Sequence, residues 1–208
     1  KDVVKEEPPK KVEPKVVEKK VTIPKVEPVV VETPKVIPKK IAKKKAAIIK
    51  SNLKKLLDTK KCPNCDLSKA NLSGVDLSKA NLKNANLSDA NLNGANLSNA
   101  NLKKANLSRA NLKKARMVKT KLNSANLSDA NLEGASLSMA ILIRAKLRNA
   151  NLHRADLGMA KLNIADLTDA DLTEANLMFA KLNGAILIGA ILDGAILDGA
   201  KMEGVIED

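Results

Sequence analysis

The amino-acid sequence predicts an all-β solenoid, preceded by a short helix and an extended spacer. The first observation behind this prediction is a leucine-class residue at every fifth position from Leu67 to Met202, with no insertion that breaks the register. The second is the near absence of aromatic residues, since the 208 residues include one Phe and no Trp or Tyr. The third is a pair of composition changes, near residues 39 and 60, which divides the chain into three segments.

The first segment, residues 1–39, is predicted to be a disordered spacer. It holds seven of the eight prolines among Val, Lys and Glu, and it shows no hydrophobic period. Proline interrupts helices, and this composition buries too little apolar surface to offset the entropy lost on ordering. The stretch PKVIP lacks the Pro-x-x-Pro spacing of a polyproline ligand, so we interpret the segment as a linker.

The second segment, residues 40–60, is predicted to be a basic amphipathic helix. Its apolar residues fall on one helical stripe and its lysines fall largely elsewhere. Such a helix can lie on an anionic membrane or cover the end of the next domain, and the lack of a linker after it favours the capping role. The stripe consists of Ile41, Ile48, Ile49, Leu53, Leu56 and Leu57.

The third segment, residues 61–208, repeats the unit Ala-(Asn/Asp)-Leu-x-x, with 28 consecutive leucine-class centres and Met117 as the one interruption before Met202. In a helix, five residues rotate by about 500°, so the leucines would spiral around every side. In a straight strand, an odd spacing would send successive leucines to opposite faces. The chain must therefore bend after each short extended stretch and coil around an Ala/Leu interior, with hydrogen bonds between coils about 4.8 Å apart.

The unit resembles the A-(D/N)-L-x-x signature of the pentapeptide-repeat family, from Cys65 to about Gly204. This resemblance implies a right-handed quadrilateral β-helix with four units per coil, and hence about seven coils. It implies little about function, because one fold can carry many functions. Some members of the family protect DNA gyrase by imitating DNA with an acidic surface.

Cys62 and Cys65 have the Cys-x-x-Cys spacing of zinc knuckles and redox centres. In the five-residue register, however, both fall on inward positions of the first coil. Zinc needs about four ligands, yet the chain has no other Cys and its single His, His153, lies several coils away. We interpret the pair as small hydrophobic core residues, while a disulfide, a metal shared between chains and a redox role remain open alternatives.

One apolar column is predicted on the outer surface. Residues 20 apart stack on one side of a four-unit coil, which aligns Met139, Met159 and Phe179, with Ile141 at the adjacent corner and Met178 nearby. An exposed apolar patch of this kind often marks a partner surface. The alternative is that these side chains cover a neighbouring corner or face the spacer.

A second column contains Lys121, Lys161, Lys181 and Lys201, interrupted by Ile141. It could bind an anion, but a solvated edge that discourages aggregation is the simpler interpretation. The sequence shows no Gly-rich phosphate loop and no insertion that could house an active site. We therefore predict no catalytic residue, no cofactor and no metal site.

Charge changes along the chain. Residues 1–60 carry 18 Lys and Arg against 8 Asp and Glu, and residues 61–120 carry 11 against 3, whereas residues 161–208 carry 3 against 9. This basic beginning disfavours the DNA-mimic role and permits binding to nucleic acid or an anionic membrane. The leading hypothesis is a non-catalytic scaffold that binds another protein.

The end of the repeat array is predicted to associate with a second copy. Isoleucines replace the usual polar residue before the central leucine there, and no helix follows in this sequence to cover the last coil. Exposed strand-like edges can pair, so either two such ends associate or the acidic residues there forestall pairing, and we expect a weak homodimer. These acidic residues are Asp193, Asp198, Glu203, Glu207 and Asp208. The isoleucines are Ile186, Ile191, Ile196 and Ile206. The sequence starts at Lys1 and contains no apolar run of the roughly 18 to 20 residues that span a bilayer, and the localisation is undetermined.

Overall fold

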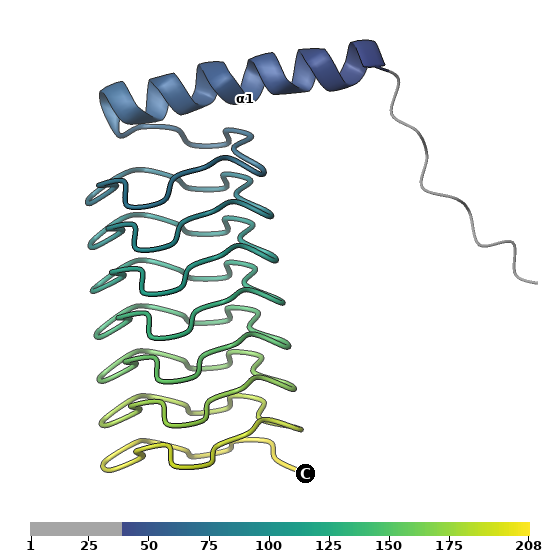
Figure 1. Cartoon of the computed structure of the whole chain (residues 1–208). Helices are drawn as coiled ribbons and strands as arrows, with labels where there is room; N and C mark the ends of the chain where they lie inside the picture. Colours follow the sequence, from purple (N-terminus) through teal and green to yellow (C-terminus); the bar gives the residue numbers. More distant parts are fainter. Residues whose placement is uncertain (1–38) are drawn as a thin grey trace, which may run out of the picture. The chain divides into compact units, whose positions relative to one another are not determined.

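The computed structural model describes the chain from Lys39 to Asp208 (Figure 1). Helix α1, Lys39–Thr59, is followed by a column of stacked coils that extends to Ile206. The helix begins one residue before the predicted boundary, and the rest of the predicted spacer lies outside the described residues.

Each coil contains 20 residues, because every β-bridge pairs a residue with the one 20 positions later, from Lys61↔Asn81 to Ile186↔Ile206. All the bridges are parallel and isolated rather than joined into long strands. The reason is that a turn follows each short extended stretch, which leaves one bridged residue per unit. Four five-residue units therefore complete one coil.

The turns explain how a period of five is possible. In each unit the N–H of the next unit's first residue donates to the central leucine's carbonyl, as from Ala70 to Leu67 O at 3.0 Å. The residue before that Ala has a positive φ, such as 61° at Lys69. A positive φ confined to the third of four turn residues is the pattern of a type II turn. Repetition of this turn winds the chain in one direction.

The core consists of the inward Leu and Ala positions. The central leucines from Leu67 to Leu182 are at most 1% exposed, and Met117 fills one of these positions with no exposure. Thr120 takes an Ala position, and its hydroxyl is satisfied because Oγ1 donates to Leu97 O at 2.8 Å. The side chains that fill this interior are mainly Leu and Ala, with Met117 and Thr120, and within the described coils none of the buried core residues is aromatic.

The Asn or Asp before each leucine has two structural roles. Its Oδ1 accepts the N–H two residues later, as from Ser88 to Asn86 at 3.2 Å, which is an Asx turn. Where this residue is Asn, its amide can also donate to the equivalent residue of the preceding coil, as from Asn86 to Asp66 at 3.1 Å and from Asn106 to Asn86 at 3.3 Å. An aspartate can only accept, so Asp66 suits the start of this ladder.

Helix α1 lies across the first coil (Figure 1). Leu56 is fully buried, and Ile49 and Leu53 pack against the same core. Asn52 Nδ2 donates to Asp66 O at 2.9 Å, which fixes the helix to the coil. Ile41, Ile48 and Leu57 remain about half exposed. Only part of the predicted apolar stripe therefore contacts the solenoid.

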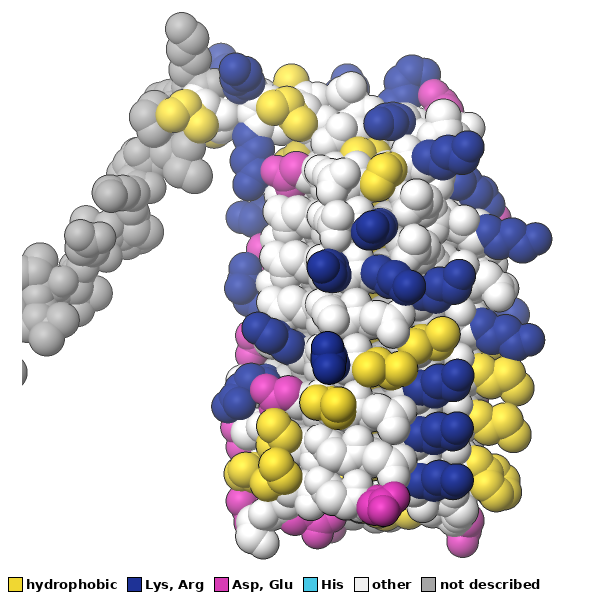
Figure 2. Space-filling view, turned by 180° about the vertical axis from the view of Figure 1, so that it is seen from behind, with side chains coloured by type: hydrophobic (Ala, Val, Ile, Leu, Met, Phe, Trp, Pro, Cys, Tyr) yellow, Lys and Arg dark blue, Asp and Glu magenta, His cyan; other side chains and the backbone are white. Residues whose placement is uncertain are grey.

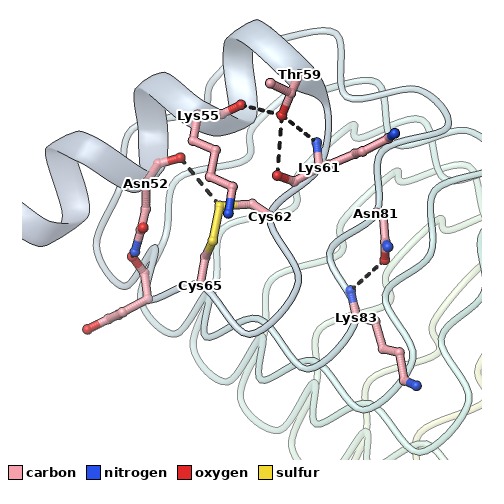
Figure 3. The surroundings of a disulfide bond; sticks show 9 residues. Asn52, Lys55, Thr59, Lys61, Cys62, Cys65, Asn81 and Lys83 are labelled. Carbon is pink, nitrogen blue, oxygen red and sulfur yellow. Dashed lines mark hydrogen bonds between the residues drawn. A yellow bond between two sulfur atoms is a disulfide. The ribbon is translucent and has the colours of Figure 1, made fainter.

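Cys62 and Cys65 form a disulfide below helix α1 (Figure 3). The prediction that both side chains are inward is confirmed, since they are 0% and 7% exposed. The prediction that they serve simply as unbonded core residues is wrong. The turn between them brings their Cα atoms to 5.4 Å, within the range for a disulfide. Cys62 Sγ also lies 3.4 Å from Asn52 O, at the contact between helix and coil.

We predict that Ile164→Gly stabilises the protein. Ile164 has φ 58° and is 55% exposed, so a β-branched residue occupies the left-handed region with little packing in return. Removal of this strain should raise the free energy of unfolding by about 1 kcal/mol in urea titrations. Ile143→Gly is the control, because Ile143 is a turn isoleucine of the preceding coil that lies one residue before the positive-φ position of its own unit and lacks a positive φ. It should be destabilising, and equal effects of the two changes would contradict the assignment of strain.

We also predict that reduction of the Cys62–Cys65 disulfide weakens the solenoid at its helix end. A loop this short should contribute about 1.5–2 kcal/mol through restriction of the unfolded chain. Dithiothreitol should lower the urea midpoint of the wild-type protein and leave the midpoint of the Cys62→Ala/Cys65→Ala variant unchanged. An identical wild-type midpoint with and without reductant would show that the bond contributes nothing to stability.

Candidate partner-binding surface

Met139, Met159 and Phe179 form an apolar ridge along one corner of the column. They occupy the third turn position in three successive coils, with φ of 59°, 56° and 55°. Their exposed fractions are 44%, 52% and 55%. The same corner carries Lys119 before the ridge and Gly199 after it. The third turn position has a positive φ throughout the array, so what distinguishes the ridge is that three large, exposed apolar side chains stack there in successive coils.

A shallow groove lies beside the ridge, and Gly158 forms its floor. Gly158 stands between Ser138 and Met178 in a column of residues that otherwise have side chains. Its φ is not positive, so the backbone does not require glycine there. The groove is bounded by the ridge on one side and by Asp156 and Asn176 on the other.

The polar groups around this groove are satisfied within the protein. Asp156 Oδ1 accepts from Gly158 N at 3.0 Å and from Asn176 Nδ2 at 3.0 Å, and Oδ2 accepts from the Ser138 hydroxyl. These bonds hold the polar wall in place. The free contact area of the groove is consequently the apolar surface of the ridge and Met178.

A lysine ladder, formed by Lys161, Lys181 and Lys201, follows the other side of the ridge. Bridges connect each of these lysines to the next, and all three are exposed. Each lies two residues after the corner position, so Lys161 follows Met159 and Lys181 follows Phe179. Among residues 39–208, none of the three has a carboxylate within ion-pair distance. Figure 2 shows a row of basic side chains next to hydrophobic ones at the edge of the column.

The structure brings most of the predicted surface together. Met178 lies in the groove beside the ridge. Ile141 is half-buried and belongs to the lysine column, since it is bridged to both Lys121 and Lys161. Sequence reasoning missed Gly158, although the break it makes in the column between Ser138 and Met178 was the available signal.

The predicted C-terminal isoleucines do not form a single patch. Ile186 and Ile206 share one column, and Ile191 and Ile196 lie on two other sides. Ile186 is half-buried, whereas the other three are 43–50% exposed. The core leucines of this coil, Leu192 and Leu197, are only partly buried. In the described part of the chain, the coil therefore presents an open apolar end with isoleucines around it.

Ion pairs between successive coils account for several lowered carboxylate pKa values elsewhere on the column. Arg109 Nε lies 2.8 Å from Asp89 Oδ1, and this hydrogen bond holds the pKa of Asp89 below its usual value. Arg154 and Glu174 form the equivalent pair at 2.7 Å, and the pKa of Glu174 is lowered for the same reason. Exposed pairs of this kind contribute little stability, and we regard them as structural.

His153 lies on the surface near Glu133 and Asp171. Across residues 39–208, no three His, Cys, Asp or Glu side chains are grouped so that they could hold a metal ion. Helix α1, the only helix in this range, does not combine the length and the apolar composition that a membrane span requires.

Comparisons with known proteins agree with this architecture. Pentapeptide repeats are recognised in eight copies over residues 61–89, 90–129, 125–163 and 170–206. No curated protein sequence matches the chain.

Several solved structures are similar. The full-length plasmid-mediated fluoroquinolone resistance protein QnrB1 is 18% identical, with a TM-score of 0.55 over 71% of this chain and 82% of that one. HetL from Nostoc sp. strain PCC 7120, a protein involved in the regulation of heterocyst differentiation, is 32% identical over 70% of this chain and 84% of its own, with a TM-score of 0.29. Rfr23 from Cyanothece 51142 is 29% identical over 77% of this chain and 99% of its own, with a TM-score of 0.31.

Proteins of this family form right-handed quadrilateral β-helices. Three findings agree. Each coil consists of four five-residue units, the Leu and Ala positions face inward, and the family match covers more than half of the sequence. The chain belongs to the pentapeptide-repeat family.

Proposed function

We propose that this protein is a non-catalytic scaffold that binds another protein through the apolar ridge and the groove at Gly158. The observation that carries the proposal is the ridge itself, in which Met139, Met159 and Phe179 are about half exposed in the left-handed conformation. Folding alone favours Gly or Asn at such positions. Binding to a partner gives a physical reason for large apolar residues there.

The body of the solenoid also supports a binding role. Its interior is filled by Leu and Ala that are almost wholly inaccessible, so the contacts it offers are on its outer surface. The coils are joined by regular backbone hydrogen bonds of 2.6–3.1 Å. A rigid surface loses little conformational entropy on binding, which favours affinity.

The charges of the first coils argue against a DNA-mimic role. The three acidic residues of residues 61–120 are all paired with bases: Asp66 with Lys45, Asp76 with Lys60 and Asp89 with Arg109. This region is therefore strongly basic on its exposed surface. The same observation supports a second candidate function, in which nucleic acid or an anionic membrane binds at the helix end of the molecule.

We predict that Phe179→Glu strongly reduces capture of the partner. The immobilised full chain and its variants should be incubated with an extract of native cells, and the bound proteins quantified by mass spectrometry. Loss of a central aromatic contact should reduce partner recovery about tenfold or more. Glu174 shows that glutamate is accommodated at this turn position. Ile164→Glu is the matched control, with the same turn position and exposure on another corner.

Equal recovery of every bound protein by wild type, Phe179→Glu and Ile164→Glu would contradict the scaffold proposal. Recovery of nucleic acid or lipid that is lost in high salt and unaffected by Phe179→Glu would instead favour the second candidate, because backbone phosphate contacts are strongly salt-dependent.

We also propose a weak homodimer through the C-terminal end. The partly exposed Leu192 and Leu197 and the exposed isoleucines around them support apolar contact there. The turns that border this coil carry glycine at the third position from Gly184 to Gly204, so few side chains obstruct a second backbone.

We expect multi-angle light scattering of the full chain to show a concentration-dependent dimer. Ile191→Glu/Ile196→Glu should shift it to monomer, because four added carboxylates would meet the acidic residues Asp193 and Asp198 of the two ends. Lys146→Glu, on an exposed position far along the column, is the control and should leave association unchanged. A monomeric wild type at every concentration would contradict this proposal.

A further inference from the structure

We infer that the occupant of the apolar ridge is an acidic amphipathic α-helix, which lies along the corner with its apolar side on the ridge and its carboxylates on the lysine ladder. This inference rests on the proposed scaffold function and specifies the chemistry of the partner.

The spacing of the ridge favours a helix over an extended peptide. Successive coils are about 4.8 Å apart, and a helix presents one side chain on a given face about every 5.4 Å. Across the three levels from Met139 to Phe179 the mismatch is only about 1.2 Å. A strand repeats on one face about every 6.7 Å, so its mismatch would reach about 4 Å. Apolar residues at i, i+3 or i+4, and i+7 of a helix can therefore contact all three ridge residues.

Charge determines which kind of helix fits. On the side of the ridge that carries Lys161, Lys181 and Lys201, these exposed cations lack a carboxylate partner among the described residues. On the other side, the Asp156 carboxylate is already bonded to Ser138, Gly158 and Asn176. The positive charge beside the ridge therefore lies on one side, at the lysine ladder, whereas the carboxylates of Asp156 and the exposed Asp198 lie on the other side. A partner with carboxylates on the corresponding flank is complementary to the lysine ladder.

The groove provides a place for one apolar anchor. A Cβ on Gly158 would lie 3.1 Å from Asp156 Oδ1, so even an alanine would begin to fill the space. At Gly199, on the ridge corner itself, the Phe179 ring occupies the space that a Cβ would take. The ring therefore lies over Gly199 and extends the contact surface to the last coil. A leucine or phenylalanine from the partner helix can insert between Met159 and Met178.

Two other occupants are less complementary. A second copy of this chain, placed ridge to ridge in the antiparallel orientation, would bring the two lysine ladders together and create like-charge repulsion. A membrane surface would meet the lysines and the ridge, but it would leave the groove at Gly158 unfilled. An acidic amphipathic helix can contact the ridge, pair with the lysine ladder and fill the groove at the same time.

The inference can be tested by selection of random peptides of about 16 residues, or four helical turns, displayed on phage. The full chain is the target, and the Phe179→Glu variant is used for counter-selection. We expect the enriched peptides to have helically spaced apolar residues with Asp or Glu on one flank. Fluorescence anisotropy of an enriched synthetic peptide should then show binding to the full chain, with weakening of about tenfold or more by Phe179→Glu.

Further variants separate the parts of the surface. Lys161→Glu and Lys181→Glu should each lower the affinity for the peptide about two- to fivefold. Gly158→Leu should also lower this affinity, because the leucine side chain would fill the groove. Lys146→Glu is the matched control, since Lys146 is an exposed lysine at the same bridge position on another side. It should leave peptide binding unchanged.

Enriched peptides without helical spacing or acidic residues would overturn the inference, as would binding that depends equally on Lys146 and Lys181. If such results accompanied Phe179-dependent capture of a cellular protein, the scaffold function would stand and the helix would be wrong. If no capture depended on Phe179, both would fail. A third outcome is that no peptide is enriched, while the wild-type protein binds phosphatidylserine vesicles and Phe179→Glu does not. This outcome would show that the occupant of the ridge is a membrane surface and not a helix.

Discussion

The structure depends on one constraint, which is that every fifth side chain must point into the same narrow interior. A type II turn in each unit makes this possible, because it redirects the chain while the leucine carbonyl bonds to the next unit, as between Leu67 and Ala70. The bridges 20 residues apart then hold each coil against the next. An insertion that is not a multiple of five would move every later leucine out of the interior, which explains why the array contains none.

The same constraint creates the candidate binding surface. Since the register fixes which residues stack, three substitutions spaced by 20 residues are enough to build a continuous ridge from Met139 to Phe179. The lysine ladder arises in the same way, two residues further along each coil. The core is indifferent to the residues at these outer positions, so a specific surface can be placed on an otherwise uniform column. Its cost is local strain at the turns, which the many backbone bonds can sustain.

Much of this architecture could be predicted from the sequence, because the inward positions are chemically distinct. The burial of the central leucines follows directly from the period, whereas the stacking of Met139 on Met159 also needs the four units per coil that the family resemblance implies. The left-handed turn residues could not be predicted in the same way, since Lys, Arg and Met at that position have no preference for a positive φ. The glycines from Gly184 to Gly204 were the signal available. The Cys62–Cys65 disulfide and the groove at Gly158 depend on atomic geometry that spacing alone leaves open.

The most direct test of the central constraint is thermal unfolding, followed by circular dichroism, of two insertions between Ala165 and Asp166. One variant gains two complete five-residue units, and the other gains a single asparagine. We expect the two-unit insertion to retain a cooperative transition near the wild-type midpoint, because every leucine still faces inward. The single asparagine should lower the midpoint strongly. Equal midpoints for the two variants, or greater damage from the two-unit insertion, would contradict the claim that the five-residue register holds the structure together.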